Sequence, residues 1–300
     1  MLLDYILPLL LIGGIFMILS MSLNLINGFC GQFSLGHAGF WAIGAYASAI
    51  SSVYFPITGL HPELNLIISL LVGFFASSLF GLVVGVPCLR LRGDYLAIAT
   101  LGFGEIVRIV IINTDYIGGP RGFTGIPKWV GIHHVYLWVI VILIILRNLK
   151  YSTHGRAIIA IREDEIAAES MGVNLVKYKV IAFVLGAGFA GIAGGLFAHS
   201  QQFLHPNNFN FMWSVVILVM VILGGLGSLT GSLIGALIIT ILPELLKFFG
   251  PEVARFRMII YPTMLITLMI VRPKGFFGTK EIWPLTPPKS KLKKDLAGGV

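Results

Sequence analysis

The stretch VIAFVLGAGFAGIAGGLFAHSQ, residues 180–201, contains no Asp, Glu, Lys or Arg. It lies in a longer charge-free interval that runs from Val180 to Pro243, and a second such interval runs from Tyr5 to Pro62. Because a helix crosses the apolar part of a bilayer with about 20 residues, each interval is long enough for two or more crossings. The sequence therefore predicts a polytopic membrane protein.

The composition indicates the same class of protein. Of the 300 residues, 57% are hydrophobic and 11% are charged, whereas soluble domains carry about 25% charged residues. Backbone amides in lipid must be paired internally, and runs rich in Leu, Ile, Val and Gly suit helices better than barrels. The expected fold is an all-α bundle of about 8–9 transmembrane helices, with broken or re-entrant segments. The apolar runs predict spans near residues 5–26, 38–55, 64–89, 95–112, 134–149, 179–200, 212–226, 231–249 and 258–271.

The distribution of basic residues predicts the orientation. With the basic tail, residues 274–300, placed in the cytoplasm, most of the 21 Lys and Arg residues fall on that side, as the positive-inside rule requires. Residues 1–273 then form the membrane domain, with its N-terminus outside, a retained first span and a cytoplasmic loop at 151–178. The net charge of +8 does not indicate nucleic acid, because the aromatic residues lie within apolar runs and form no basic groove.

Two glycine-rich stretches interrupt the apolar pattern. The first, NGFCGQFSLGHAGFWAIGAY at 27–46, places Gln32, Ser34 and His37 at membrane depth, where polar side chains are costly unless they line a cavity or a partner helix. These three residues are the candidates for a substrate pathway. The second stretch is GGLGSLTGSLIGA at 224–236, and here small residues that allow close helix packing are the favoured interpretation. Two rows of small residues at four-residue spacing are candidates for such packing: Ala187, Gly191 and Gly195, and Gly227, Gly231 and Gly235.

Other motifs give little chemistry. Gly186, Gly188 and Gly191 spell GxGxxG, but a dinucleotide site needs a preceding strand. Glu105 and Arg108 are spaced to pair on one helix face, and a structural pair is favoured over a role in translocation. The seven histidines form no HExxH motif or comparable cluster with a carboxylate, and the adjacent His133 and His134 are expected to point apart in a loop. No metal site is expected, and both cysteines are expected to be packing residues.

The segment 151–178 gathers an unusual share of the few charges. Ile158, Ile161, Ile166 and Met171 are spaced to form the apolar side of one short helix, which predicts either a docking element for a soluble partner or a solvated loop. The charged residues on its other side are Arg162, Glu163, Asp164, Glu165 and Glu169.

Longer stretches of the chain resemble the LivM-type permease of branched-chain amino acid ABC importers. The residues that carry the resemblance are GQFSLGHAGFWAIGAY (31–46), LRLRGDYLAIATLGFGEIVRI (89–109), GGPRGFTGIP (118–127), GRAIIAIREDEIAAESMGVNLVKYKVIAFVLGAGFAGIAGGLFA (155–198) and GGLGSLTGSLIGA (224–236). In such importers an EAA loop forms the coupling helix that docks on the ATPase. Ala167, Ala168 and Gly172 occupy the expected spacing, but Ile166 stands where the pattern has Glu, and Glu165 is one position early.

The resemblance implies a permease subunit that is not itself an enzyme, in the plasma (inner) membrane of a prokaryote. It implies a LivH-type permease partner, two ABC ATPase subunits that bind ATP, and an extracytoplasmic amino-acid-binding protein, with alternating access as the mechanism. No GxxxxGK[ST] sequence occurs, so no cofactor is expected in this chain. Two alternatives stay open: a permease of the same family for urea or short amides, and an ion-coupled secondary carrier, for which Glu105 is the one strong candidate residue.

Overall fold

The predicted apolar spans become helices in the part of the chain that the structure describes. This structure is a computed structural model, and it describes residues 2–56, 61–88 and 93–248, together with 263, 267, 275–278 and 281. Within these residues there is no strand, only an isolated bridge between Phe123 and Leu204. The predicted all-α fold is confirmed. The ninth predicted span and most of the basic tail lie outside the described residues.

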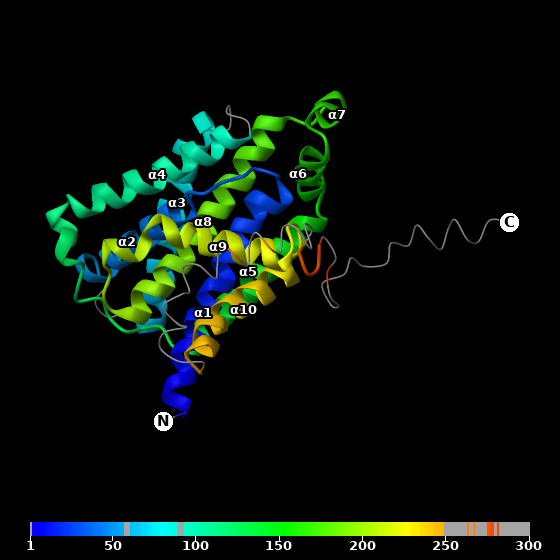
Figure 1. Ribbon diagram of the computed structural model, residues 1–300. Helices are drawn as coiled ribbons and strands as arrows, with labels where there is room; N and C mark the ends of the chain where they lie inside the picture. Colours follow the sequence, from blue (N-terminus) through cyan, green and yellow to red (C-terminus); the bar gives the residue numbers. More distant parts are fainter. Residues whose placement is uncertain are drawn as a thin grey trace.

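Eight predicted spans coincide with eight apolar helices, and their ends differ by a few residues (Figure 1). These helices are α1 (Leu2–Asn24), α2 (His37–Tyr54), α3 (Pro62–Cys88), α4 (Asp94–Ile112), α5 (Ile132–Tyr151), α8 (Leu175–Gln201), α9 (Phe211–Gly224) and α10 (Leu229–Phe248). The shorter elements are the π-helix η1 (Leu25–Phe29), the 3-10 helices η2 (Asp115–Ile117), η3 (Gly119–Arg121) and η4 (Pro206–Phe209), and the helices α6 (Thr153–Glu163) and α7 (Glu165–Ser170). By length and composition, 6 of the described helices can cross a membrane, α2 and α10 not among them.

Helix α8 lies at the centre of the bundle, where α2 and α3 pack against it through glycine (Figure 1). A Cβ added to Gly44 of α2 would lie 2.2 Å from the Cα of Gly191, and one added to Gly191 would lie 2.4 Å from the carbonyl oxygen of Gly73 in α3. Farther along α8, Ala187 faces Gly81 and Gly195 faces Leu70. The backbones of these three helices are therefore in direct contact. All three glycines of the GxGxxG sequence lie inside α8: Gly188 and Gly191 face α3, and Gly186 faces Ile26 of η1.

The second small-residue row packs α9 against α10. Gly231 lies against the backbone of Gly224, and a Cβ on Gly235 would approach the carbonyl oxygen of Met220 to 2.1 Å. Gly227 differs from the expected row because it precedes α10 and has a φ of 90°. Its role is in the turn between the helices, where glycine adopts positive φ without strain.

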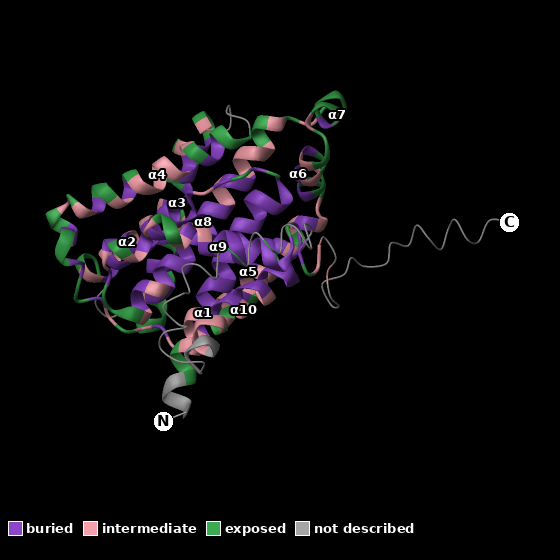
Figure 2. Cartoon of the chain, in the orientation of Figure 1, coloured by how far each residue is buried: buried purple, intermediate pink, exposed green. Residues whose placement is uncertain are grey.

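The outer surface of the bundle is apolar where it would meet lipid. Phe75 and Val83 of α3 and Ile98 and Ile106 of α4 are each more than half exposed. Figure 2 shows exposed residues along α4 and α7 and buried residues through the centre of the bundle. Apolar side chains on spanning helices meet lipid chains, so this exposure fits a membrane protein.

Helices α1 and α5 run in the same direction. Near their starts, the Tyr136 hydroxyl donates to the Leu10 carbonyl at 3.2 Å, and at their far ends the Lys150 ammonium lies 5.1 Å from the ring centre of Phe29. Helices α6 and α7 follow α5 directly, so they lie at the far end, remote from the N-terminus (Figure 1). We call this the α7 end of the bundle.

We expect Gly191→Ala to lower the free energy of unfolding by about 1–3 kcal/mol, because the added methyl group meets a backbone oxygen that cannot move aside. The midpoint of thermal unfolding in detergent measures the change. Gly102→Ala is the matched control, since a Cβ on Gly102 of α4 has nothing within 4 Å. Equal melting of the two variants would contradict the close contact between α3 and α8.

Candidate functional site

The first glycine-rich stretch is a break between α1 and α2. After Asn24 the helix widens into η1, and residues 31–36 are irregular before α2 begins at His37. The Asn27 side chain holds the shape of this break: its Oδ1 accepts the Ser34 N–H at 3.2 Å, and its Nδ2 donates to the Ser34 carbonyl at 3.4 Å. The Leu35 N–H donates to Thr100 Oγ1 of α4 at 3.0 Å. Such partners are necessary because backbone groups outside a helix have no partner in lipid.

The structure places the three predicted pathway residues together along this break. Gln32, Ser34 and His37 are all buried, and His37 Nε2 lies 2.8 Å from Ser22 Oγ of α1. Gln32 Oε1, Ser34 Oγ and His37 Nδ1 are buried atoms without a hydrogen-bond partner among the described residues. Nearly all buried polar atoms in proteins are hydrogen-bonded, so three neighbouring exceptions require an explanation.

A cavity of about 480 Å³ lies elsewhere, between the ends of α2 and α3 that are remote from α7. Ile50, Ser52, Ile68, Ser69 and Trp129 are among its lining residues, and none of the three pathway candidates is. In this conformation of the single chain, Gln32, Ser34 and His37 are therefore enclosed.

Asn24 joins the two glycine-rich stretches, a role that the sequence analysis missed. Its Nδ2 donates to the Ser228 carbonyl at 2.8 Å and to Ser232 Oγ at 2.7 Å, and its Oδ1 accepts the Gly227 N–H at 2.9 Å. A Cβ on Gly28 would lie 2.5 Å from the Gly227 nitrogen, so the two breaks touch. The signal in the sequence was an amide side chain near the end of the first predicted span, 5–26, where a polar side chain needs a partner.

Arg162 of α6 contacts the same break from the α7 end. Its Nη1 donates to the Gly28 carbonyl at 2.8 Å, and its Cγ would lie 2.9 Å from a Cβ on Gly31. Gly31 has a φ of 72°, so this position needs glycine both for its backbone and for the approach of Arg162. Arg162 also pairs with Glu163, and this hydrogen bond lowers the pKa of the Glu163 carboxyl.

The charged segment is two helices, which corrects the prediction of a single helix. Ile158 and Ile161 of α6 are buried, whereas Ile166 of α7 is 78% exposed and Met171, directly after it, is 84% exposed. The four residues do not form one apolar side, because the chain turns at Asp164, where the backbone is extended. The helical spacing of 3.6 residues per turn correctly predicted the buried side of α6. It did not predict α7, because the chain turns between the two helices.

Caps at both ends define α7. Asp164 Oδ1 accepts the N–H groups of Ile166 and Ala167 at 2.9 and 3.0 Å. Gly172 follows the helix with a φ of 84°, and a Cβ there would have nothing within 4 Å. Such an N-cap and left-handed glycine are the usual ends of a helix. Among the other expected coupling residues, Ala168 is buried, Ala167 and Glu169 are exposed, and Glu165 pairs with Lys179 of α8.

A carboxylate near the C-terminus holds the second break. Glu281 accepts the N–H groups of Leu229 and Thr230 at 2.9 and 3.0 Å, at the start of α10, and pairs with Lys150 at 2.5 Å. Lys150 also donates to the Gly227 carbonyl at 2.8 Å. A negative charge at a helix N-terminus is stabilising. Part of the predicted tail is therefore integrated into the bundle.

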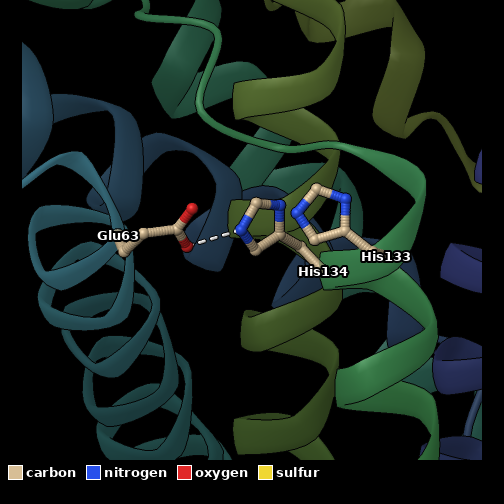
Figure 3. A group of neighbouring side chains, drawn as sticks. All are labelled: Glu63, His133 and His134. Carbon is tan, nitrogen blue, oxygen red and sulfur yellow. Dashed lines mark hydrogen bonds and ion pairs between the residues drawn. The ribbon is translucent and has the colours of Figure 1, made fainter.

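The structure tests the predictions about the Glu105–Arg108 pair and about the histidines. Glu105 and Arg108 do pair, at 2.8 Å, and Glu105 Oε1 also accepts the Phe211 N–H at the start of α9. The statement that histidines form no cluster with a carboxylate is wrong. His133 and His134 lie in the first turn of α5, not in a loop, and Glu63 of α3 lies beside them (Figure 3).

Two broken segments that meet inside a helical bundle are typical of a membrane transport protein. Residues 5–269 match the family described as the branched-chain amino acid transport system permease component, and the chain belongs to this family. It is 35% identical to the high-affinity branched-chain amino acid transport system permease protein LivM of Salmonella typhimurium, over 95% of this chain and 71% of the relative. The LivM protein of Escherichia coli matches equally well, at 35% identity over the same shares.

A more distant relative is the high-affinity branched-chain amino acid transport system permease protein LivH of Escherichia coli, which is 24% identical over 90% of this chain and 94% of the relative. No solved structure matches the chain. Since these relatives are transport permeases, the chain is a transport protein and not an enzyme.

We expect Asn24→Leu to lower the free energy of unfolding by about 1–3 kcal/mol, because it leaves the buried Gly227 N–H without its partner. Asn113→Leu is the matched control: its Nδ2 bonds the Ile109 carbonyl at the exposed end of α4. Thermal unfolding in detergent compares the two. If both variants melt like the parent, the two breaks do not depend on Asn24.

Proposed function

We propose that the chain is a transmembrane permease subunit of an ABC importer for leucine, isoleucine and valine. The observation that carries the proposal is α7, a capped helix that exposes two apolar side chains at one end of a bundle whose relatives are branched-chain amino acid permeases. Its partners are a LivH-type permease, two ATPase subunits that bind and hydrolyse ATP, and an extracytoplasmic amino-acid-binding protein. The complex lies in the plasma membrane of a prokaryote, with α7 in the cytoplasm.

The exposure of Ile166 and Met171 supports docking. Helix α7 is surrounded by Asp164, Glu165 and Glu169, so it lies outside the apolar layer, and its apolar residues meet water and not lipid. Large apolar groups exposed beside charges are typical of a protein interface, with the charges at its rim. A groove on the ATPase subunit receives the two side chains, and Glu169 sets the register.

The contacts of α6 give a route by which motion of the ATPase reaches the membrane part. Ile158 and Ile161 fix α6 to the bundle, and Arg162 connects its last turn to Gly28 and Gly31 in the first break. Asn24 continues the connection to Gly227 in the second break. Movement of α7 therefore displaces both breaks, and the permease pair rocks between inward-open and outward-open states.

The substrate pathway runs along the first break. A zwitterionic amino acid needs acceptors for its ammonium group and donors for its carboxylate, and the unpaired atoms of Gln32, Ser34 and His37 supply polar groups of this kind. Phe40 and Trp41, which follow on α2, supply an apolar surface for a branched side chain. These atoms are enclosed in the single chain, so the proposal requires that the partner permease and the outward-open state uncover them.

The combined change Ile166→Asp and Met171→Asp tests the function directly. In vesicles that contain the complete transporter, we expect leucine uptake and co-purification with the ATPase subunits to fall about tenfold or more, because interface anchors each contribute about 2 kcal/mol or more. The membrane domain should keep its thermal unfolding midpoint, since both side chains are exposed.

The control is Ile166→Leu with Met171→Leu, which keeps the surface apolar and should keep uptake. If unlabelled isoleucine or valine lowers leucine uptake and urea does not, the proposed substrates are supported. If only urea lowers the uptake, the substrates are urea or short amides instead. Normal uptake by the double Asp variant would exclude docking through α7.

We expect Gln32→Leu to lower leucine uptake by about three- to tenfold, the value of one hydrogen bond to substrate. Because Gln32 Oε1 has no hydrogen-bond partner among the residues that the structure describes, the change should leave folding and ATPase association intact. Gln201→Leu, at an exposed position at the end of α8, is the control. Equal uptake by both variants would remove Gln32 from the pathway.

A further inference from the structure

Three ligating side chains from distant parts of the sequence meet at the end of the bundle opposite to α7. Glu63 is the second residue of α3, and His133 and His134 are the second and third residues of α5 (Figure 3). His134 Nε2 lies 2.6 Å from Glu63 Oε2, and the centres of the two imidazole rings lie 3.9 Å apart. One ligand atom from each of the three residues lies within 4.8 Å of the others.

The three side chains have the chemistry of a zinc site. Two imidazoles and one carboxylate, with water in the fourth position, are a common ligand set for tetrahedral Zn²⁺. Bond lengths of about 2.0–2.2 Å place tetrahedral ligand atoms about 3.4 Å apart. The observed distance between His134 Nε2 and Glu63 Oε2, 2.6 Å, is shorter than this value, and the 4.8 Å limit that holds for all three ligand atoms is longer. Nitrogen ligands also select against Mg²⁺ and Ca²⁺, which prefer oxygen.

The positions of the side chains allow the small shift that an ion requires. Glu63 and His133 are exposed and start helices, so their side chains can turn toward a common centre. His134 is buried, and its Nδ1 accepts the Gly131 N–H at 3.0 Å, so its Nε2 carries the proton that bonds Glu63. When an ion takes Nε2, the neutral imidazole carries its proton on Nδ1, and the hydrogen bond from the Gly131 N–H is lost.

We propose that Glu63, His133 and His134 form a binding site for Zn²⁺ or a similar divalent transition-metal ion. The ion replaces the proton between His134 and Glu63 and adds His133 as a third ligand. It ties the start of α3 to the start of α5, and α5 leads through Ser152 into α6. The ion thus fixes the start of α5, and the other end of α5 leads into α6, whose last turn carries the Arg162 contact. This site exists whether or not α7 docks on an ATPase.

The test is equilibrium dialysis of the full-length chain, purified in detergent without a polyhistidine tag, against Zn²⁺. We expect one Zn²⁺ per chain. His133→Ala and Glu63→Gln should each weaken binding about tenfold or more, since even indirect partners of a metal are worth about 10- to 100-fold in affinity. Co²⁺ in place of Zn²⁺ should give the visible absorption of a tetrahedral site, and His133→Ala should abolish it.

Glu63→Gln separates a metal site from a structural hydrogen bond. The amide oxygen of glutamine still accepts the proton of His134, so the variant keeps the hydrogen bond and its unfolding midpoint without metal, but loses the carboxylate ligand. His154→Ala, which removes an exposed histidine of α6, should bind Zn²⁺ like the parent. Unchanged Zn²⁺ binding by His133→Ala and Glu63→Gln, or no binding by the parent chain, would overturn the site and leave only the bond between Glu63 and His134.

Discussion

Backbone that leaves the helix inside an apolar bundle must find hydrogen-bond partners, and this constraint determines the centre of the structure. Asn24 meets it at the second break by bonding Gly227 and Ser228, and Asn27 meets it at the first break by bonding Ser34. Glycine allows the two breaks to approach until their backbones touch. The amide side chains of Asn24 and Asn27 are therefore placed where the helices are interrupted.

The same constraint explains why Arg162 matters more than its neighbours. An arginine that bonds a main-chain carbonyl of η1, just before the irregular residues 31–36, acts on the backbone itself. Glu163 and Glu165 are satisfied within the chain by Arg162 and Lys179. Ile166 and Met171 therefore form the surface that α7 presents, and Arg162 connects the helix behind it to the interior.

The sequence predicted the features that depend on consecutive residues, such as the helices. It did not predict contacts between residues that are far apart in the sequence. Apolar runs predicted eight helices, because lipid disfavours charge along a span, and glycine with amides predicted the first break. The turn at Asp164 was missed because isoleucine spacing continued through it. The joining of Glu63 to His134, like that of Asn24 to Gly227, requires segments far apart in sequence to pack side by side, which no local pattern records.

Contacts within the bundle are of two kinds. Helices α2, α3 and α8 meet backbone to backbone at Gly44, Gly73 and Gly191, whereas the nearest contact of Gly186 in α8 is the side chain of Ile26 in η1. A contact without side chains has no rotamer that can adjust, so the first three helices behave as one stiff block. We expect sliding to be easier at the contact between Gly186 and Ile26, because a side chain can change its rotamer there. The positions of glycine at helix contacts thus predict which helices move together and which can slide.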